Sequence, residues 1–233
     1  VTDNPVNTRR CASTSGVANG TDDDVKGLIN FIRGEDYFDY DADCNLTETR
    51  PNPLGDIYHS DLVVVAAPNA ETAFSGSNQE AYWRSIKGYD AWAASKSTRE
   101  EIIYVGANDG MLHAFNSITG EEEWGFIPPF IASKLPTIIN KAYDGKFAGD
   151  PGGTNPIFGV DGSPVVHDMY IQGLNADGDY EEGNRWRTIL MIPYGRGGAG
   201  FSVLDVTNPI INGGQGAMHM YSVFNDHINS KVL

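Results

Sequence analysis

Residues 101–115 read EIIYVGANDGMLHAF, and they predict two antiparallel strands joined by a tight turn. Residues 101–106 are rich in β-branched and aromatic side chains, and the apolar pattern resumes at 111–115. The NDG sequence at 108–110 is typical of a two-residue hairpin loop, because Asx-Gly pairs tolerate the positive φ angles that such loops need. A second turn at 116–120 and a further strand from 123 to 126 extend the hairpin to a meander of three short strands.

A similar unit recurs about 90 residues later. Strands are expected at 186–192 and 201–206, with a glycine turn at 195–200 between them. Residues 160–166 resemble a first strand for this unit, as residues 59–65 do for the earlier one. Repeated antiparallel four-stranded units are blades of a β-propeller, and two units cannot close a ring. We therefore predict a mainly β fold, a partial β-propeller with a few inserted helices and long loops.

The chain divides into an N-terminal segment and a propeller region. Residues 1–60 form an irregular, acidic lead-in with one short helix at 25–33, which Gly34 ends. Residues 61–233 form an incomplete propeller of about two to three blades with helical insertions, and 61–67 is its first buried strand. A capping box at 77–80 begins a longer helix that continues to the polar stretch after Ser95.

Composition excludes several classes of protein. The chain has 27 glycines in 233 residues, a load that suits short strands and turns and not helical bundles. Its 16 basic and 31 acidic residues give a net charge of −15, which repels phosphate backbones and argues against nucleic acid as a partner. No apolar run of transmembrane length occurs. The start at Val1, without a signal-peptide pattern, suggests a mature or truncated piece of a longer protein.

The two cysteines, Cys11 and Cys44, are not part of a C-x-x-C motif, so a zinc ribbon or a thioredoxin-type site is not supported. We favour one disulfide between them, which would close a loop of about 34 residues and stabilise by roughly 3–4 kcal/mol in the chain-entropy model. Two unpaired thiols are the alternative.

Several stretches together resemble one protein family. They include residues 103–115 and Trp124 and, in collinear order, residues 31–34, 55–60, 160–166 and 197–209. Over roughly residues 25–210 the sequence resembles the PilY family, large surface and secreted proteins tied to bacterial type IV pili. The resemblance implies a propeller of quinoprotein-like fold, a location at the cell surface or outside the cell, and a role in pilus assembly or tip adhesion. Minor pilins, other pilus proteins and a host or surface ligand are the partners that it implies.

Some members of that family are regulated by calcium, and two acidic loops here have suitable oxygen ligands. The stronger candidate loop contains the Asp-Gly-Asp turn and comprises Asn175, Asp177, Asp179, Glu181 and Glu182. The weaker one alternates oxygen ligands as an EF-hand loop does, but lacks its glycine and closing Glu, and comprises Asp39, Asp41, Asp43, Asn45 and Thr47. The alternative for each is a solvated turn between strands. The family's own calcium loop lies in a later blade and maps onto no residue of this chain.

The sequence matches known catalytic and cofactor-binding motifs only weakly. The G-x-G-x-x-G match at 195–200 precedes a strand-like run and leaves no room for the helix that a dinucleotide site needs, so we interpret it as a blade hairpin. His59 and His113 fall in strand-like runs and are expected to pack, and Trp124 is expected to pack between blades. We predict a non-enzymatic, exported pilus module, and the alternatives are a quinoprotein dehydrogenase-like enzyme fragment and a glycan-binding propeller.

Overall fold

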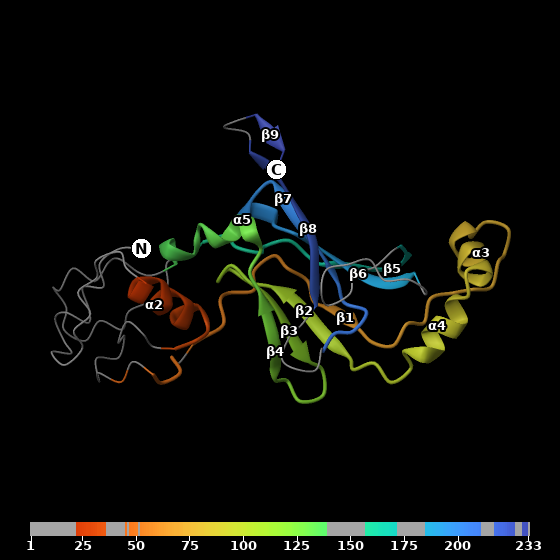
Figure 1. Ribbon diagram of the computed structural model, residues 1–233, viewed down its shortest axis with the longest axis horizontal. Coiled ribbons are helices and arrows are strands. Elements are labelled where there is room, and N and C mark those ends of the chain that lie inside the picture. Colours follow the sequence, from red (N-terminus) through yellow and green to blue (C-terminus); the bar gives the residue numbers. More distant parts are fainter. Residues whose placement is uncertain are drawn as a thin grey trace.

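The computed structural model describes residues 22–35, 45, 47–50, 52–138, 157–171, 185–210, 217–226 and 230–232. Two antiparallel sheets dominate this part of the chain (Figure 1). The first is a four-stranded meander of β1 (Val63–Val65), β2 (Ile102–Gly106), β3 (Leu112–Asn116) and β4 (Glu122–Phe126). The second contains β5 (Val165–Tyr170), β6 (Trp186–Pro193), β7 (Gly200–Asp205), β8 (Met218–Asp226) and the short β9 (Lys231–Val232). The predicted pair of blade-like units is confirmed.

β3 and β7 occupy equivalent third positions in the two sheets. Gly200 begins β7, which pairs antiparallel with β6, so the glycine-rich turn is a blade hairpin as predicted. Its first residues form a short 3₁₀ turn, η2 (Gly195–Gly197).

The main core lies between the two sheets. The first sheet contributes Val65, Ile102, Tyr104, Leu112 and Ala114, and the second contributes Leu190, Ile192 and Leu204, together with Val160 and Val206 beside it. Trp124 is part-buried against this core and donates its indole N–H to the Pro209 carbonyl at 3.0 Å. The expected inter-blade role of Trp124 is confirmed.

The turn between β2 and β3 differs from the prediction. Ala107 N–H donates to the Met111 carbonyl at 3.0 Å, which leaves a three-residue loop of Asn108, Asp109 and Gly110. Only Gly110, at φ +94°, has a positive φ angle. The three-residue loop therefore ends in a left-handed glycine, and it replaces the two-residue loop that the Asx-Gly pair predicted.

The first strand was also predicted incorrectly in part. β1 covers only three of the seven residues expected, and Val64 is 54% exposed. β1 is an edge strand that pairs on one side with β2, so only Val65 of this run is fully buried.

The helix expected after residue 77 is two helices. α3 (Gln79–Ile86) has Asn78, and not Ser77, as its N-cap, and α4 (Tyr89–Ser95) begins after Gly88. Gly88 adopts the left-handed conformation at φ +69°, which ends the first helix and changes the chain direction. α3 and α4, which come between β1 and β2 in the chain, form an arm that projects to the right of the two sheets (Figure 1).

The expected N-terminal helix is confirmed, although it begins three residues before the expected start at residue 25. α2 (Asp22–Ile32) ends just before Gly34, whose φ is +100°. Phe31 and Ile32 pack with Met111, near the short helices α5 (Pro129–Ala132) and η1 (Leu135–Thr137). α2 therefore lies against the face of the first sheet that does not contact the second sheet.

Candidate functional site

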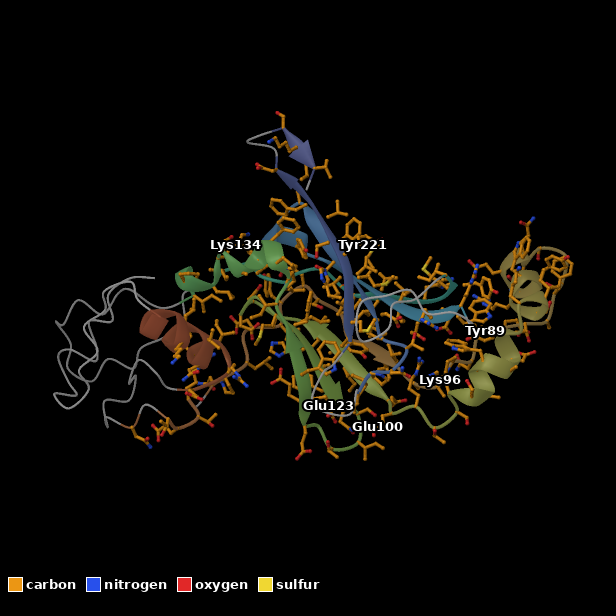
Figure 2. The ribbon with its side chains drawn as sticks, in the orientation of Figure 1. Tyr89, Lys96, Glu100, Glu123, Lys134 and Tyr221 are labelled. Carbon is orange, nitrogen blue, oxygen red and sulfur yellow. The ribbon has the colours of Figure 1, made fainter. Side chains whose placement is uncertain are left out.

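A cavity of about 770 Å³ lies between α2 and strands β3 and β4. Its wall is mostly apolar and includes Leu28 and Ile32 of α2 and Phe115 of β3. Four ionisable side chains, Arg33, His113, Glu122 and Glu123, also line it, and Figure 2 labels Glu123 on β4. An apolar hollow with a few convergent polar groups is the usual form of a binding site, so this cavity is the candidate site of the described residues.

His113 lies between two carboxylates. Its Nε2 is 2.9 Å from Asp109 Oδ2, and its Nδ1 is 2.6 Å from Glu122 Oε1. The His113 side chain is only 2% exposed and Asp109 is 4% exposed, whereas Glu122 is about half exposed. Burial lowers the pKa of His113, but the hydrogen bonds and charges of the two carboxylates outweigh burial and raise it to about 9. His113 is therefore an imidazolium at neutral pH.

Asp109 joins this cluster to the lead-in. Its Oδ2 accepts a hydrogen bond from Gly55 N–H at 2.8 Å, and its Oδ1 accepts one from Met111 N–H at 3.0 Å. Gly55 must be glycine, because a Cβ there would lie 2.5 Å from the Asp109 backbone nitrogen. One carboxylate thus holds the β2–β3 loop, the lead-in and the imidazolium together.

The geometry opposes a catalytic role for His113. A general base needs a ring nitrogen with a free lone pair, but both nitrogens of His113 donate to carboxylates. The prediction that His113 has a satisfied, structural role agrees with this arrangement. No group of three or more His, Cys, Asp or Glu side chains in the described part of the chain could hold a metal ion.

His59 is placed differently from its prediction. It lies outside any strand, and its Nδ1 is 2.8 Å from Asp161 Oδ2, a carboxylate that is 2% exposed beside the second sheet. Nearby, Asp61 N–H donates to Ser163 Oγ at 3.0 Å. These hydrogen bonds connect the segment before β1 with the segment before β5.

The predicted calcium and disulfide residues fall mostly outside the described residues. This is so for the whole stronger loop, Asn175 to Glu182, for Asp39, Asp41 and Asp43, and for Cys11 and Cys44. Asn45 and Thr47 are described, and Thr47 Oγ1 donates to Asn45 Oδ1 at 3.2 Å. Neither calcium binding nor the disulfide is therefore tested, and both stay predictions.

The stability of the chain should depend on pH through His113. Because its pKa of about 9 in the folded chain exceeds the usual 6.5, the protonated imidazole contributes its full stabilisation below about pH 6.5. That contribution is lost as the pH rises through about 9. We expect the free energy of unfolding, measured by denaturant titration, to fall more between these pH values for the wild type than for His113→Gln. Equal declines in the two chains would contradict the assignment.

Comparison with known proteins identifies relatives. Residues 54–230 match the family model described as the PilY1 beta-propeller domain. The chain is 34% identical over 188 residues to the type IV pilus biogenesis factor PilY1 of Pseudomonas aeruginosa (strain UCBPP-PA14), which covers 80% of this chain and 14% of that protein. It is 33% identical over 181 residues to a PilY1 homolog of Xylella fastidiosa, with 78% and 13% covered. The chain thus spans only about one seventh of the length of these relatives.

A solved structure also matches. The crystal structure of the Pseudomonas aeruginosa PilY1 C-terminal domain is 30% identical to the chain, covering 59% of this chain and 21% of that one, with a TM-score of 0.36.

Proposed function

The chain belongs to the PilY1 β-propeller domain family, and from this membership we propose that it is a non-enzymatic module that scaffolds type IV pilus assembly or tip adhesion. The observation that carries the proposal is the family match over residues 54–230, which spans strands β1 to β8 and the core between the two sheets. A rigid pair of packed blades suits a platform whose loops bind other proteins.

The site chemistry supports a role in binding over a role in catalysis. His113 is the buried imidazole of the cavity, and both of its nitrogens are bonded to carboxylates. The surrounding wall is apolar, which suits the burial of a partner's side chains.

The partners that we propose are minor pilins or other pilus proteins, and a host or surface ligand for adhesion. We place the module outside the cell or on its surface, associated with the pilus. Within the described residues no helix has the length and apolar character needed to cross a bilayer. Calcium is proposed as a modulator that binds the acidic loop of Asn175, Asp177, Asp179, Glu181 and Glu182, with the Asp39–Thr47 region as a weaker site.

The proposal is tested by binding between the purified 233-residue chain and soluble domains of the minor pilins from the same bacterium. We expect a saturable complex in biolayer interferometry, of micromolar affinity or tighter. Failure to bind any pilin domain, together with a quinone absorbance in the purified chain or with glycan binding, would favour one of the alternative functions.

The calcium proposal needs a separate measurement. Isothermal titration with calcium should give a binding signal that the double substitution Asp177→Asn and Asp179→Asn removes. A signal that is unchanged in this variant would contradict the assignment to this loop.

A further inference from the structure

The outer end of the arm carries an exposed apolar patch, which we call the arm patch. It consists of Phe74, Tyr82, Trp83 and Ile86, which are 53%, 44%, 54% and 51% exposed. The Phe74 and Tyr82 rings are 5.4 Å apart between centroids, and the Tyr82 and Trp83 rings are 5.7 Å apart. Ile86 follows Tyr82 by one helical turn on α3. The members therefore form one continuous surface.

The orientation of α3 is the reverse of what its side chains would favour in a core. The helix buries Ala81 and Arg84, which are 0% and 8% exposed, and turns its aromatic residues to solvent. This orientation forgoes part of the stabilisation that the aromatic side chains could give, since burying one large apolar side chain stabilises by about 1.5–3 kcal/mol. Natural sequences break such local rules chiefly at functional sites.

The arm is held rigidly at its base. Tyr89 and Trp92 of α4 pack against Trp186 of β6, and all three are at least 96% buried. The Trp186 indole N–H donates to the Lys87 carbonyl at 2.9 Å, and the Tyr89 hydroxyl donates to Asp168 of β5. Figure 2 shows Tyr89 where α4 meets the ends of β5 and β6. The arm patch is thus presented at a fixed place on a preorganised support.

The positively and negatively charged side chains near the arm patch differ in their partners. Arg84 binds Glu80 at 2.7 Å and the Glu71 carbonyl at 3.2 Å, and the Lys87 ammonium lies 5.3 Å from the Tyr170 ring centroid. The cations of this region are therefore directed toward groups of the chain itself. The carboxylates of Glu71 and Asp90 belong to exposed residues and accept hydrogen bonds from neutral donors, Ala73 N–H at 2.7 Å and Thr72 Oγ1 at 3.4 Å, which leave their negative charge in place.

We propose that the arm patch docks into an apolar groove, bordered by lysine or arginine, on a partner protein of the pilus machinery. The inference rests on the proposed function and adds to it the surface that binds and the chemistry of the partner. Because α3 stands at the projecting end of the arm (Figure 1), the patch is a knob and the partner supplies the groove. Exposed Trp and Tyr residues are the types that dominate binding energy at protein interfaces. The carboxylates beside the arm patch favour a partner groove bordered by lysine or arginine and disfavour an acidic partner surface.

The test compares Trp83→Ser and Tyr82→Ser with the wild type and with Ile118→Ser. Ile118 is 90% exposed in the turn between β3 and β4 and is the matched control, because it removes an exposed apolar side chain elsewhere. The probes are the same soluble minor-pilin domains, measured by biolayer interferometry. We expect each arm variant to weaken binding at least about tenfold and the control to change it less than about twofold. Thermal unfolding of all variants should match the wild type within about 2 °C, since each replaced side chain is exposed.

The outcomes separate this inference from the function on which it rests. Equal binding by the wild type and both arm variants would overturn the docking surface and leave the pilus function standing. Absence of pilin binding by the wild type would count against both. A wild-type chain that self-associates in sedimentation, or that binds glycans or lipid vesicles, and that loses this property in Trp83→Ser while pilin binding persists, would assign the patch to another occupant and overturn the proposal.

Discussion

Substitution of Asp109 by alanine should lower the free energy of unfolding by about 3–5 kcal/mol, enough to leave much of the chain unfolded at physiological temperature. The substitution leaves a buried imidazolium with one carboxylate in place of two, because Asp109 Oδ2 lies 2.9 Å from His113 Nε2. It also removes the acceptor for the backbone N–H groups of Gly55 and Met111. Chemical denaturation followed by circular dichroism measures the loss.

Two controls give this prediction its specificity. Glu122→Gln keeps an acceptor for His113 at a position that is about half exposed, so its cost should be about 1 kcal/mol or less. The double substitution Asp109→Ala and His113→Leu removes both partners of the buried pair, and it should cost less than the sum of the single substitutions. A loss below about 1 kcal/mol for Asp109→Ala would show that the cluster is not a structural joint.

The strands of this fold were predictable because their signals are local. The apolar runs around β2, β3, β6 and β7 alternate with turn residues, and the repeat of this pattern indicated equivalent blades. The errors arose where tertiary context decides. Val64 is exposed because β1 is an edge strand, which its apolar sequence does not reveal. Gly88 ends a helix because it adopts φ +69°, a conformation that the helical spacing around it does not report.

The candidate site was harder to predict than the fold. The sequence predicts that His113 packs within a strand, but it does not predict its two carboxylate partners. The sequence predicts only a turn at Asp109 and no role for Glu122, because only the hairpin geometry brings both carboxylates to the same imidazole. The Gly55 contact spans 54 residues of sequence. Sequence alone offers one usable signal, an Asp four residues before a His within a predicted hairpin, and that signal is not specific.

The glycine content has a second cause that composition did not reveal. Glycine was expected to serve turns, yet Gly106, Gly159 and Gly197 allow backbone to approach backbone where the two sheets meet. A Cβ on Gly106 would lie 2.2 Å from the Val160 carbonyl oxygen, and one on Gly159 would lie 2.6 Å from the Gly110 backbone. The two blades thus meet partly through direct contact of main-chain atoms. A side-chain rotamer change could not remove the clash that an added Cβ would cause there.

Gly197→Ala should therefore be among the most damaging single-methyl additions in the chain. The new Cβ would lie 1.6 Å from the Gly159 carbonyl oxygen and 2.7 Å from its carbon, and neither atom can move without shifting the loop before Val160. We expect a loss of about 3 kcal/mol or more, at the upper end of the cost of overpacking, because both clashing partners are backbone. Gly125→Ala is the matched control, since its Cβ would meet the flexible Met111 thioether at 3.2 Å. Thermal unfolding of both variants measures the difference. A Gly197→Ala chain as stable as Gly125→Ala would mean that the two sheets do not meet through this glycine contact.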